Sequence, residues 1–307
     1  MFCGMTIYQI FWYFIIYSLI GWMIEVIFLA VTQGKIVNRG FLNGPLCPVY
    51  GSGVLMVLIV LYLVDSILGI KTSVDASHPM ILFAIGIVFA TLIEFMAGFI
   101  LDKLFHARWW DYSERKFNIN GYICLEFSIV WGLAIAFVLR VIQPGIENIV
   151  DMIPHILGIL FLVIIYLIFD ADIVITVLTV LKMNKQLERM EDIQKSILKI
   201  SNEMSELIGS GTIKTMGKLE KGYETATIKQ LQLHENLNEN KEELLSAIKN
   251  SKEDYQKRRL ELEERFEHLK KEFMYSKLFG TRRLLIAFPG MKHNLYQKMI
   301  DKLKENR

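Results

Sequence analysis

The sequence predicts an all-α protein: a polytopic bundle of five membrane-spanning helices with a cytoplasmic helical, coiled-coil tail. Hydrophobic residues make up 53% of the 307 positions, and the mean hydropathy is +0.35. Residues 1–181 hold only 8 basic and 12 acidic side chains, whereas residues 182–307 hold the other 26 basic and 20 acidic ones. The first part therefore has the composition of a membrane domain, and the second that of a soluble one.

Five apolar stretches are long enough to span a bilayer, which takes about 20 predominantly apolar residues. They are residues 8–31, 49–69, 79–101, 121–142 and 154–181. Each is about twice as long as a strand of an outer-membrane barrel, and none alternates. Met1–Gln9 contains no Lys or Arg, so we expect the first stretch to be retained and not cleaved as a signal peptide.

The basic residues of the connecting loops predict the orientation. Loop 32–48 carries Lys35 and Arg39, and loop 102–120 carries four basic residues, whereas loops 66–78 and 143–153 carry only Lys71 between them. Cytoplasmic loops are enriched in Lys and Arg. We therefore expect a multi-pass plasma-membrane protein with its N-terminus outside and its tail in the cytoplasm.

Acidic side chains inside the spans are the first candidates for a functional site, because they are costly in lipid and usually face a bundle interior or water. Five of them are the candidates, and at 1.5 Å per residue these five fall in the cytoplasmic half of the membrane: Glu25, Glu94, Glu126, Asp170 and Asp172. Arg39 and Arg108 on the inner loops are the expected partners. With Asp111, this set predicts a polar cavity open to the cytoplasm. A structural ion-pair network that locks the helices together is the alternative, and it is favoured for Asp170 and Asp172.

The two inner loops supply the supporting residues. Residues 38–53 read NRGFLNGPLCPVYGSG, whose glycines and prolines exclude a regular helix, so we expect a tightly packed or re-entrant loop around Asn43 and Pro45. The second loop offers Trp109, Trp110 and Asn120. Its aromatic rings suit the membrane–water interface. The loop then serves as a membrane-interface anchor. Alternatively, its polar residues face the acidic cluster and contribute to the site.

No catalytic residues, metal ligands or cofactor are predicted. His106 has no second His or Cys at ligand spacing, and no nucleotide-binding motif occurs in the chain.

Three motifs resemble those of the ABC-transporter type IV, or CmpB-type, permease family. They are RGFLNGPLCPVYG at 39–51, RWWDYS at 108–113 and FNINGYICLE at 117–126, and the early Gly21, Trp22 and Glu25 also fit. The resemblance covers roughly Tyr8–Leu181. It implies a membrane permease component with an ATPase in a separate chain, and it brings no established substrate or catalytic residues.

The remaining residues, 182–307, are predicted to be helical. Apolar residues follow a heptad spacing from Met183 to Leu207, and a second pattern of 3–4 residues runs from Leu245 to Phe273. Self-association and an intramolecular antiparallel hairpin would both bury these seams. Residues 276–307 form a basic amphipathic segment that could lie on the inner leaflet, dock onto the membrane half or pack on the tail. Acids interleave with the lysines, so we expect no nucleic acid as a partner.

Three functions are consistent with these patterns. The first is a permease or transporter component that uses the acidic cavity. The second is a membrane scaffold or sensor whose tail recruits partner proteins or a second copy. The third, which fewest features support, is a membrane-embedded enzyme acting on lipid through paired carboxylates.

Overall fold

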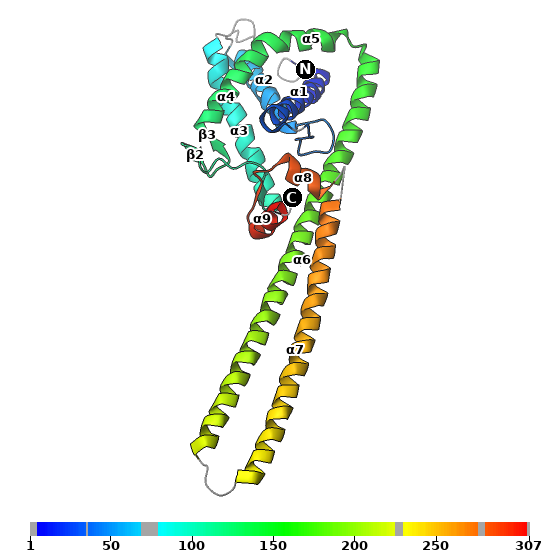
Figure 1. Cartoon of the computed structure of the whole chain (residues 1–307). Coiled ribbons are helices and arrows are strands. Elements are labelled where there is room, and N and C mark those ends of the chain that lie inside the picture. Colours follow the sequence, from blue (N-terminus) through cyan, green and yellow to red (C-terminus); the bar gives the residue numbers. More distant parts are fainter. Residues whose placement is uncertain (1–4, 35, 69–78, 225–229, 276–279, 306–307) are drawn as a thin grey trace. The chain divides into compact units, whose positions relative to one another are not determined.

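The computed structural model describes residues 5–34, 36–68, 79–224, 230–275 and 280–305 (Figure 1). The chain divides into two compact units. The first comprises residues 1–184 and 276–297, and the second comprises residues 185–275 and 298–307. The loop with Lys71 lies outside the described residues.

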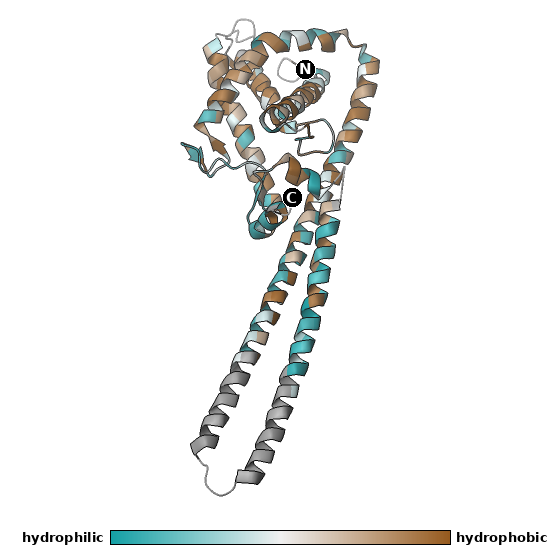
Figure 2. Ribbon diagram, viewed as in Figure 1, coloured by the Kyte–Doolittle hydropathy of each residue, from teal (hydrophilic) through white to brown (hydrophobic). Residues whose placement is uncertain are grey.

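The first unit is built from apolar helices. They are α1 (Ile7–Gln33), α2 (Pro48–Leu68), α3 (Pro79–Phe105), α4 (Leu125–Phe137), α5 (Gln143–Met152) and the first part of α6 (His155–Glu224). Four helical stretches have the length and hydropathy of membrane spans, namely Ile7–Gln33, Pro79–Phe105, Leu125–Met152 and His155–Leu207, whereas the apolar section of α2, Pro48–Val64, is shorter. Figure 2 shows the apolar residues along these helices. The second predicted span, 49–69, and with it the count of five spans, therefore stay predictions.

Glycines allow neighbouring helices to approach closely. A Cβ atom on Gly21 of α1 would lie 2.2 Å from the ring of Tyr50 on α2, and one on Gly51 would lie 2.3 Å from the hydroxyl of Ser18. Between α3 and α4, a Cβ on Gly132 would lie 2.5 Å from Ile87. Small residues at such crossings are typical of membrane helices. At the first crossing they bring Tyr50 against the helix that carries Glu25.

The fourth predicted span continues further than its apolar residues indicate. A π-helical turn, η1 (Val138–Ile142), joins α4 directly to α5, so residues 143–152 are helical where a loop was expected. Figure 1 shows α5 running across the end of the bundle. Pro144 follows η1 within two residues and has no N–H to donate to the preceding helical turn. The π turn and the proline together account for the bend.

Four two-residue strands occur in the described part of this unit. β2 (Asn118–Ile119) and β3 (Ile123–Cys124) form an antiparallel hairpin before α4. β1 (Ala107–Arg108) follows α3 and pairs antiparallel with β4 (Lys292–His293), opposing Ala107 to His293 and Arg108 to Lys292. Helix α8 (Thr281–Ala287) precedes β4. Residues 280–297, which we call the docked segment, thus belong to the first unit although more than 140 positions separate them from α4.

The second unit contains the rest of α6, α7 (Gln230–Tyr275) and most of α9 (Gln297–Glu305). Its buried apolar side chains come from all three helices: Leu187, Met190, Phe266, Phe273, Met299, Ile300 and Leu303. The ammonium group of Lys302 lies 4.9 Å from the centre of the Phe266 ring, which links α9 to α7. The coiled-coil pairing of the tail stays a prediction.

Candidate functional site

The two inner loops meet at one end of the helices. The ring of Phe41 in the first loop lies 5.1 Å from that of Trp109 in the second, and 5.9 Å from that of Phe105. Trp109 is only 4% exposed and also contacts Phe288. Its ring thus packs inside the protein and does not face the membrane–water interface. The motifs that the sequence analysis singled out are therefore neighbours in space.

Glu25 is paired with Arg39, one of the two arginines expected near the intramembrane acids. The guanidinium Nη1 of Arg39 lies 3.2 Å from Oε2 of Glu25, and its plane lies over the ring of Phe28 at 4.9 Å. The hydroxyl of Tyr50 donates to Oε1 of Glu25 at 2.7 Å. Both oxygens of Glu25 therefore have partners, and its charge is compensated.

Glu94 has a different environment. It is 5% exposed, in the middle of the long apolar helix α3. The indole of Trp131 donates to its Oε2 at 2.9 Å, and the hydroxyl of Tyr112 donates to its Oε1 at 3.2 Å. Among the described residues, no basic side chain pairs with it. Trp131 also contacts the Tyr50 ring edge-on at 5.2 Å, so the surroundings of Glu94 and Glu25 are continuous.

Arg108 belongs to a separate cluster around Asp102. Its Nε donates to Oδ2 of Asp102 at 3.1 Å, and its Nη1 donates to the carbonyl of Asn120 at 3.1 Å. The hydroxyl of Tyr122 donates to Oδ2 of Asp102 at 2.6 Å, and the amide of Asn294 donates to Oδ1. Asp102 is 4% exposed. It joins the end of α3, the second loop and the docked segment in one network.

Asp111 faces the docked segment. Its Oδ2 lies 2.7 Å from Nζ of Lys292, and its Oδ1 lies 3.8 Å from Nη1 of Arg108. Burial raises the pKa of this carboxyl, but the hydrogen bonds from Lys292 and Ser113 outweigh it and hold the pKa below its usual range. The hydrogen bond between Lys292 and Asp111 also raises the pKa of Lys292. Asp111 and Arg108 are therefore both in ion pairs.

Asp172 holds the first inner loop from the side of α6. Its carboxylate accepts hydrogen bonds from the backbone N–H groups of Asn43 at 3.0 Å and Gly44 at 2.7 Å, and from the Asn43 amide at 3.0 Å. Thr176 adds a hydroxyl at 3.3 Å. Successive backbone N–H groups that surround a carboxylate form an anion nest. Asp172 thus orders the irregular loop.

Arg283 binds the carbonyl groups of the same loop, whereas Asp172 binds its N–H groups. Its Nη1 donates to the carbonyl of Gly40 at 2.8 Å, and its Nη2 donates to that of Phe41 at 2.8 Å; a longer contact of 3.4 Å reaches Asn38. Arg283 is 8% exposed. Burial lowers its pKa to about 10, so it stays protonated at neutral pH.

His293 secures the docked segment to α6. Its Nδ1 accepts from the backbone N–H groups of Leu295 and Tyr296, both at 3.2 Å, and its Nε2 lies 3.2 Å from the amide oxygen of Asn184. The amide nitrogen of Asn184 donates to the carbonyl of Phe105 at 2.8 Å. Burial lowers the pKa of His293 to about 4. The ring is therefore neutral and donates through Nε2.

The other sequence candidates lie outside these clusters or support them. The Glu126 side chain is 61% exposed and pairs with Arg115 at 3.2 Å, so the structure does not bring it to Glu94. Asp170 and Pro45 are exposed. The indole of Trp110 donates to the carbonyl of Tyr122 at 2.9 Å. The polar cavity among Glu25, Glu94 and Arg108 stays a prediction.

Sequence reasoning did not single out the partners supplied from the far end of the chain. Arg283, Lys292, His293 and Asn294 contact residues more than 100 positions away. Only the close succession of basic and apolar residues in 276–307 indicated that this segment could dock. Asp102 was counted as a loop residue, and nothing in the sequence marked it as the centre of a network.

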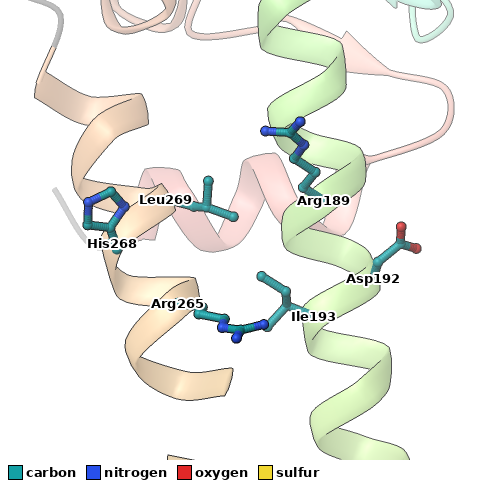
Figure 3. A pocket seen from close by; sticks show the side chains of 6 residues that line it. All are labelled: Arg189, Asp192, Ile193, Arg265, His268 and Leu269. Carbon is teal, nitrogen blue, oxygen red and sulfur yellow. The ribbon is translucent and has the colours of Figure 1, made fainter. Parts of the chain in front are cut away.

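A cavity of about 460 Å³ lies in the second unit, between α6 and α7. Ile193 and Leu269 provide its apolar lining, and Arg189, Asp192, Arg265 and His268 its polar one. Figure 3 shows Arg189 and Arg265 directed into the space between the helices, whereas the carboxylate of Asp192 is directed away from α7. The cavity therefore presents mainly positive charge.

The chain belongs to the family described as "Putative ABC-transporter type IV", whose model matches residues 12–177. This is the resemblance that the loop motifs indicated. With its long apolar helices, the chain is a multi-pass membrane protein, and the family description is that of a transporter component and not of an enzyme. A search of curated proteins and a search of solved structures found no match.

Proposed function

We propose that this member of the ABC-transporter type IV family is the membrane-spanning component of a transporter, and that Glu94 binds a cationic group of the transported molecule or a coupling proton. One observation carries the proposal. Glu94 is buried in a span and accepts hydrogen bonds from neutral Trp131 and Tyr112, with no cation beside it in the described structure.

Glu94 differs from the other buried or paired acids in that no basic side chain of the described structure compensates its negative charge. A buried carboxylate without a positive partner is costly, and intramembrane acids of this kind mark ion and proton pathways. Glu25 has Arg39, Asp102 has Arg108 and Asp111 has Lys292. Glu94 is thus the group whose charge an incoming cation or proton would balance.

The topology that accompanies this proposal has five spans, an outer N-terminus and a cytoplasmic tail in the plasma membrane. Contact between the two basic inner loops supports their placement on one side, and the positive-inside rule assigns that side to the cytoplasm. The ATPase would be a separate chain acting at this face.

A thermal-shift experiment on purified protein tests the role of Glu94. The probes are Na⁺, K⁺, Mg²⁺, choline and spermidine, each at pH 5.5 and pH 7.5. At least one cation, or the pH change, is expected to shift Tm for the wild type and not for Glu94→Gln. Glu126→Gln is the matched control, because Glu126 is exposed and paired with Arg115.

Uptake of the stabilising cation into proteoliposomes then measures transport. We expect Glu94→Gln to abolish uptake and Glu126→Gln to retain it. If Glu94→Gln responds to every probe and to pH as the wild type does, Glu94 is a structural residue and the proposal is wrong.

A second function, a membrane scaffold or sensor whose tail recruits a partner or a second copy, is favoured by the tail cavity. Its arginines surround an apolar floor of Ile193 and Leu269, which suits an acidic amphipathic segment of a partner protein. Replacing residues 201–257 by a short Gly–Ser linker leaves the docked segment and this cavity in place, whereas Arg189→Glu with Arg265→Glu removes the positive charge.

The charge-reversal variant discriminates between the functions. If the protein is a scaffold, the charge-reversal variant loses its cellular phenotype while it is inserted normally. If the phenotype survives the reversal and depends on Glu94, the tail cavity is accessory.

A further inference from the structure

The β2–β3 hairpin exposes apolar side chains at the end of the bundle. Phe117 is 79% exposed and Ile119 is 55% exposed. Lys116, immediately before Phe117, is also exposed. Of the preceding loop, by contrast, Trp109 is buried and Trp110 is half-buried with its indole bonded to the carbonyl of Tyr122.

Hydrogen bonds fix the shape of the hairpin. The amide of Asn118 donates to the carbonyls of Arg115 at 2.7 Å and Ser113 at 3.1 Å, and its oxygen accepts from the N–H of Gly121 at 3.2 Å. Asn120 and Gly121 at the turn have φ of 51° and 74°, the left-handed values that Asn–Gly hairpin turns adopt. Phe117 is therefore exposed on an ordered element.

The backbone of Phe117 has an unfavourable conformation. Its φ is 52°, a value that is uncommon for bulky residues and costs free energy. The surrounding hydrogen bonds maintain this conformation, and the described residues leave the ring 79% exposed.

The exposed apolar surface of α4 continues into the hairpin. Leu125, the first residue of α4, donates its N–H to the carbonyl of Phe117 at 3.3 Å. Leu125, Ile129 and Leu133 follow at intervals of four and are 46%, 41% and 59% exposed. Residues at this spacing lie on one face of a helix. On a membrane-spanning helix, that face contacts lipid, and Phe117 adjoins its end.

We propose that the β2–β3 hairpin lies in the headgroup region of the bilayer, with Phe117 and Ile119 at the boundary with the acyl chains and Lys116 beside anionic lipid headgroups. Aromatic residues concentrate at this depth, and basic residues near the surface are attracted to anionic lipids. The occupant of the patch is lipid because the patch continues the lipid-facing surface of α4. The hairpin thereby anchors the second inner loop, which carries Arg108 and Asp111, at a fixed depth.

Spin-label accessibility in vesicles tests the depth. The full chain, with Cys3→Ser, Cys47→Ala and Cys124→Ala, receives a single nitroxide through Phe117→Cys or, in a second variant, Ile119→Cys. Glu114→Cys on the same loop and Glu264→Cys on the tail are controls, since both side chains are exposed. The vesicles contain phosphatidylcholine with phosphatidylglycerol, and elution and Tm confirm folding.

At positions 117 and 119 we expect oxygen accessibility to exceed that of the controls several-fold, and accessibility to the water-soluble nickel reagent to fall several-fold. Nickel accessibility equal to that of Glu264→Cys would place the hairpin in water and overturn the proposal. Protection from both reagents would mean that a protein surface covers the patch, which also overturns it.

The charge is tested separately. Lys116→Glu is expected to increase nickel accessibility at position 119 in vesicles with phosphatidylglycerol and to leave it unchanged in pure phosphatidylcholine. An equal response in the two lipids would refute the contact with anionic headgroups.

Discussion

Arg283→Ala should release the docked segment from the first inner loop. The wild-type guanidinium makes two hydrogen bonds of 2.8 Å to the carbonyls of Gly40 and Phe41. Hydrogen bonds from charged groups contribute about 1.5–3 kcal/mol each. Once the segment has separated, water forms hydrogen bonds with the freed carbonyls and offsets part of this energy. We therefore expect Arg283→Ala to weaken docking by about 2–4 kcal/mol. The longer contact with Asn38 adds little.

Amide hydrogen exchange measures this loss locally. A change of about 2–4 kcal/mol corresponds to exchange on the order of 30- to 1,000-fold faster where local opening limits it. The increase should appear at the Asn43 and Gly44 amides and in residues 280–297. Arg282→Ala is the matched control, because Arg282 is the exposed neighbour. If exchange at these amides is the same in Arg283→Ala and Arg282→Ala, the clamp does not stabilise the loop.

Three further perturbations test the same face. Asp172→Asn should weaken the loop by about 1–3 kcal/mol, because a neutral amide accepts weaker hydrogen bonds from Asn43 and Gly44; exchange at these amides should rise, and Asp170→Asn should leave it unchanged. The pKa of His293 is lowered to about 4 in the folded protein, so the unfolded segment binds the proton more strongly. Docking should therefore be complete above about pH 6.5 and weaken as pH falls towards 4; limited proteolysis of residues 280–297 should show this, and a pH-independent His293→Asn variant would confirm the assignment. Gly121→Ala should lower Tm by several degrees, because its φ of 74° disfavours a side chain and the new Cβ would lie 2.5 Å from Oδ1 of Asp111; an unchanged Tm would contradict the packing described for the turn.

The sequence was sufficient to predict the long apolar helices, because hydropathy averaged over 20 residues does not depend on tertiary contacts. It also named Arg39 as one of two expected partners of the intramembrane acids, and Arg39 lies 3.2 Å from Glu25. The irregular loop around Asn43 followed from its glycines and prolines. The family followed from the loop motifs and was confirmed over residues 12–177.

The remaining contacts depend on how distant segments fold back, which periodicity does not encode. Arg283 reaches a loop more than 240 positions earlier, and Lys292 pairs with Asp111 across 181 positions of sequence. Arg108 was expected beside the intramembrane acids, yet it pairs with Asp102 because the second loop turns back onto the end of α3. Helix α5 was missed because an amphipathic helix at the end of a span has a loop-like polar composition.

The five acids first grouped by depth differ in what compensates their charge, and this difference narrows the functional question. Glu25 and Glu126 have arginines, at 3.2 Å in both cases, and Asp172 is surrounded by backbone N–H groups. Asp170 is exposed. Glu94 alone among them is buried with only neutral donors in the described structure. Depth grouped all five together, whereas their surroundings set Glu94 apart, because Glu25, Glu126 and Asp172 have compensated charges and Asp170 is exposed. A functional cation or proton should therefore be sought first at Glu94.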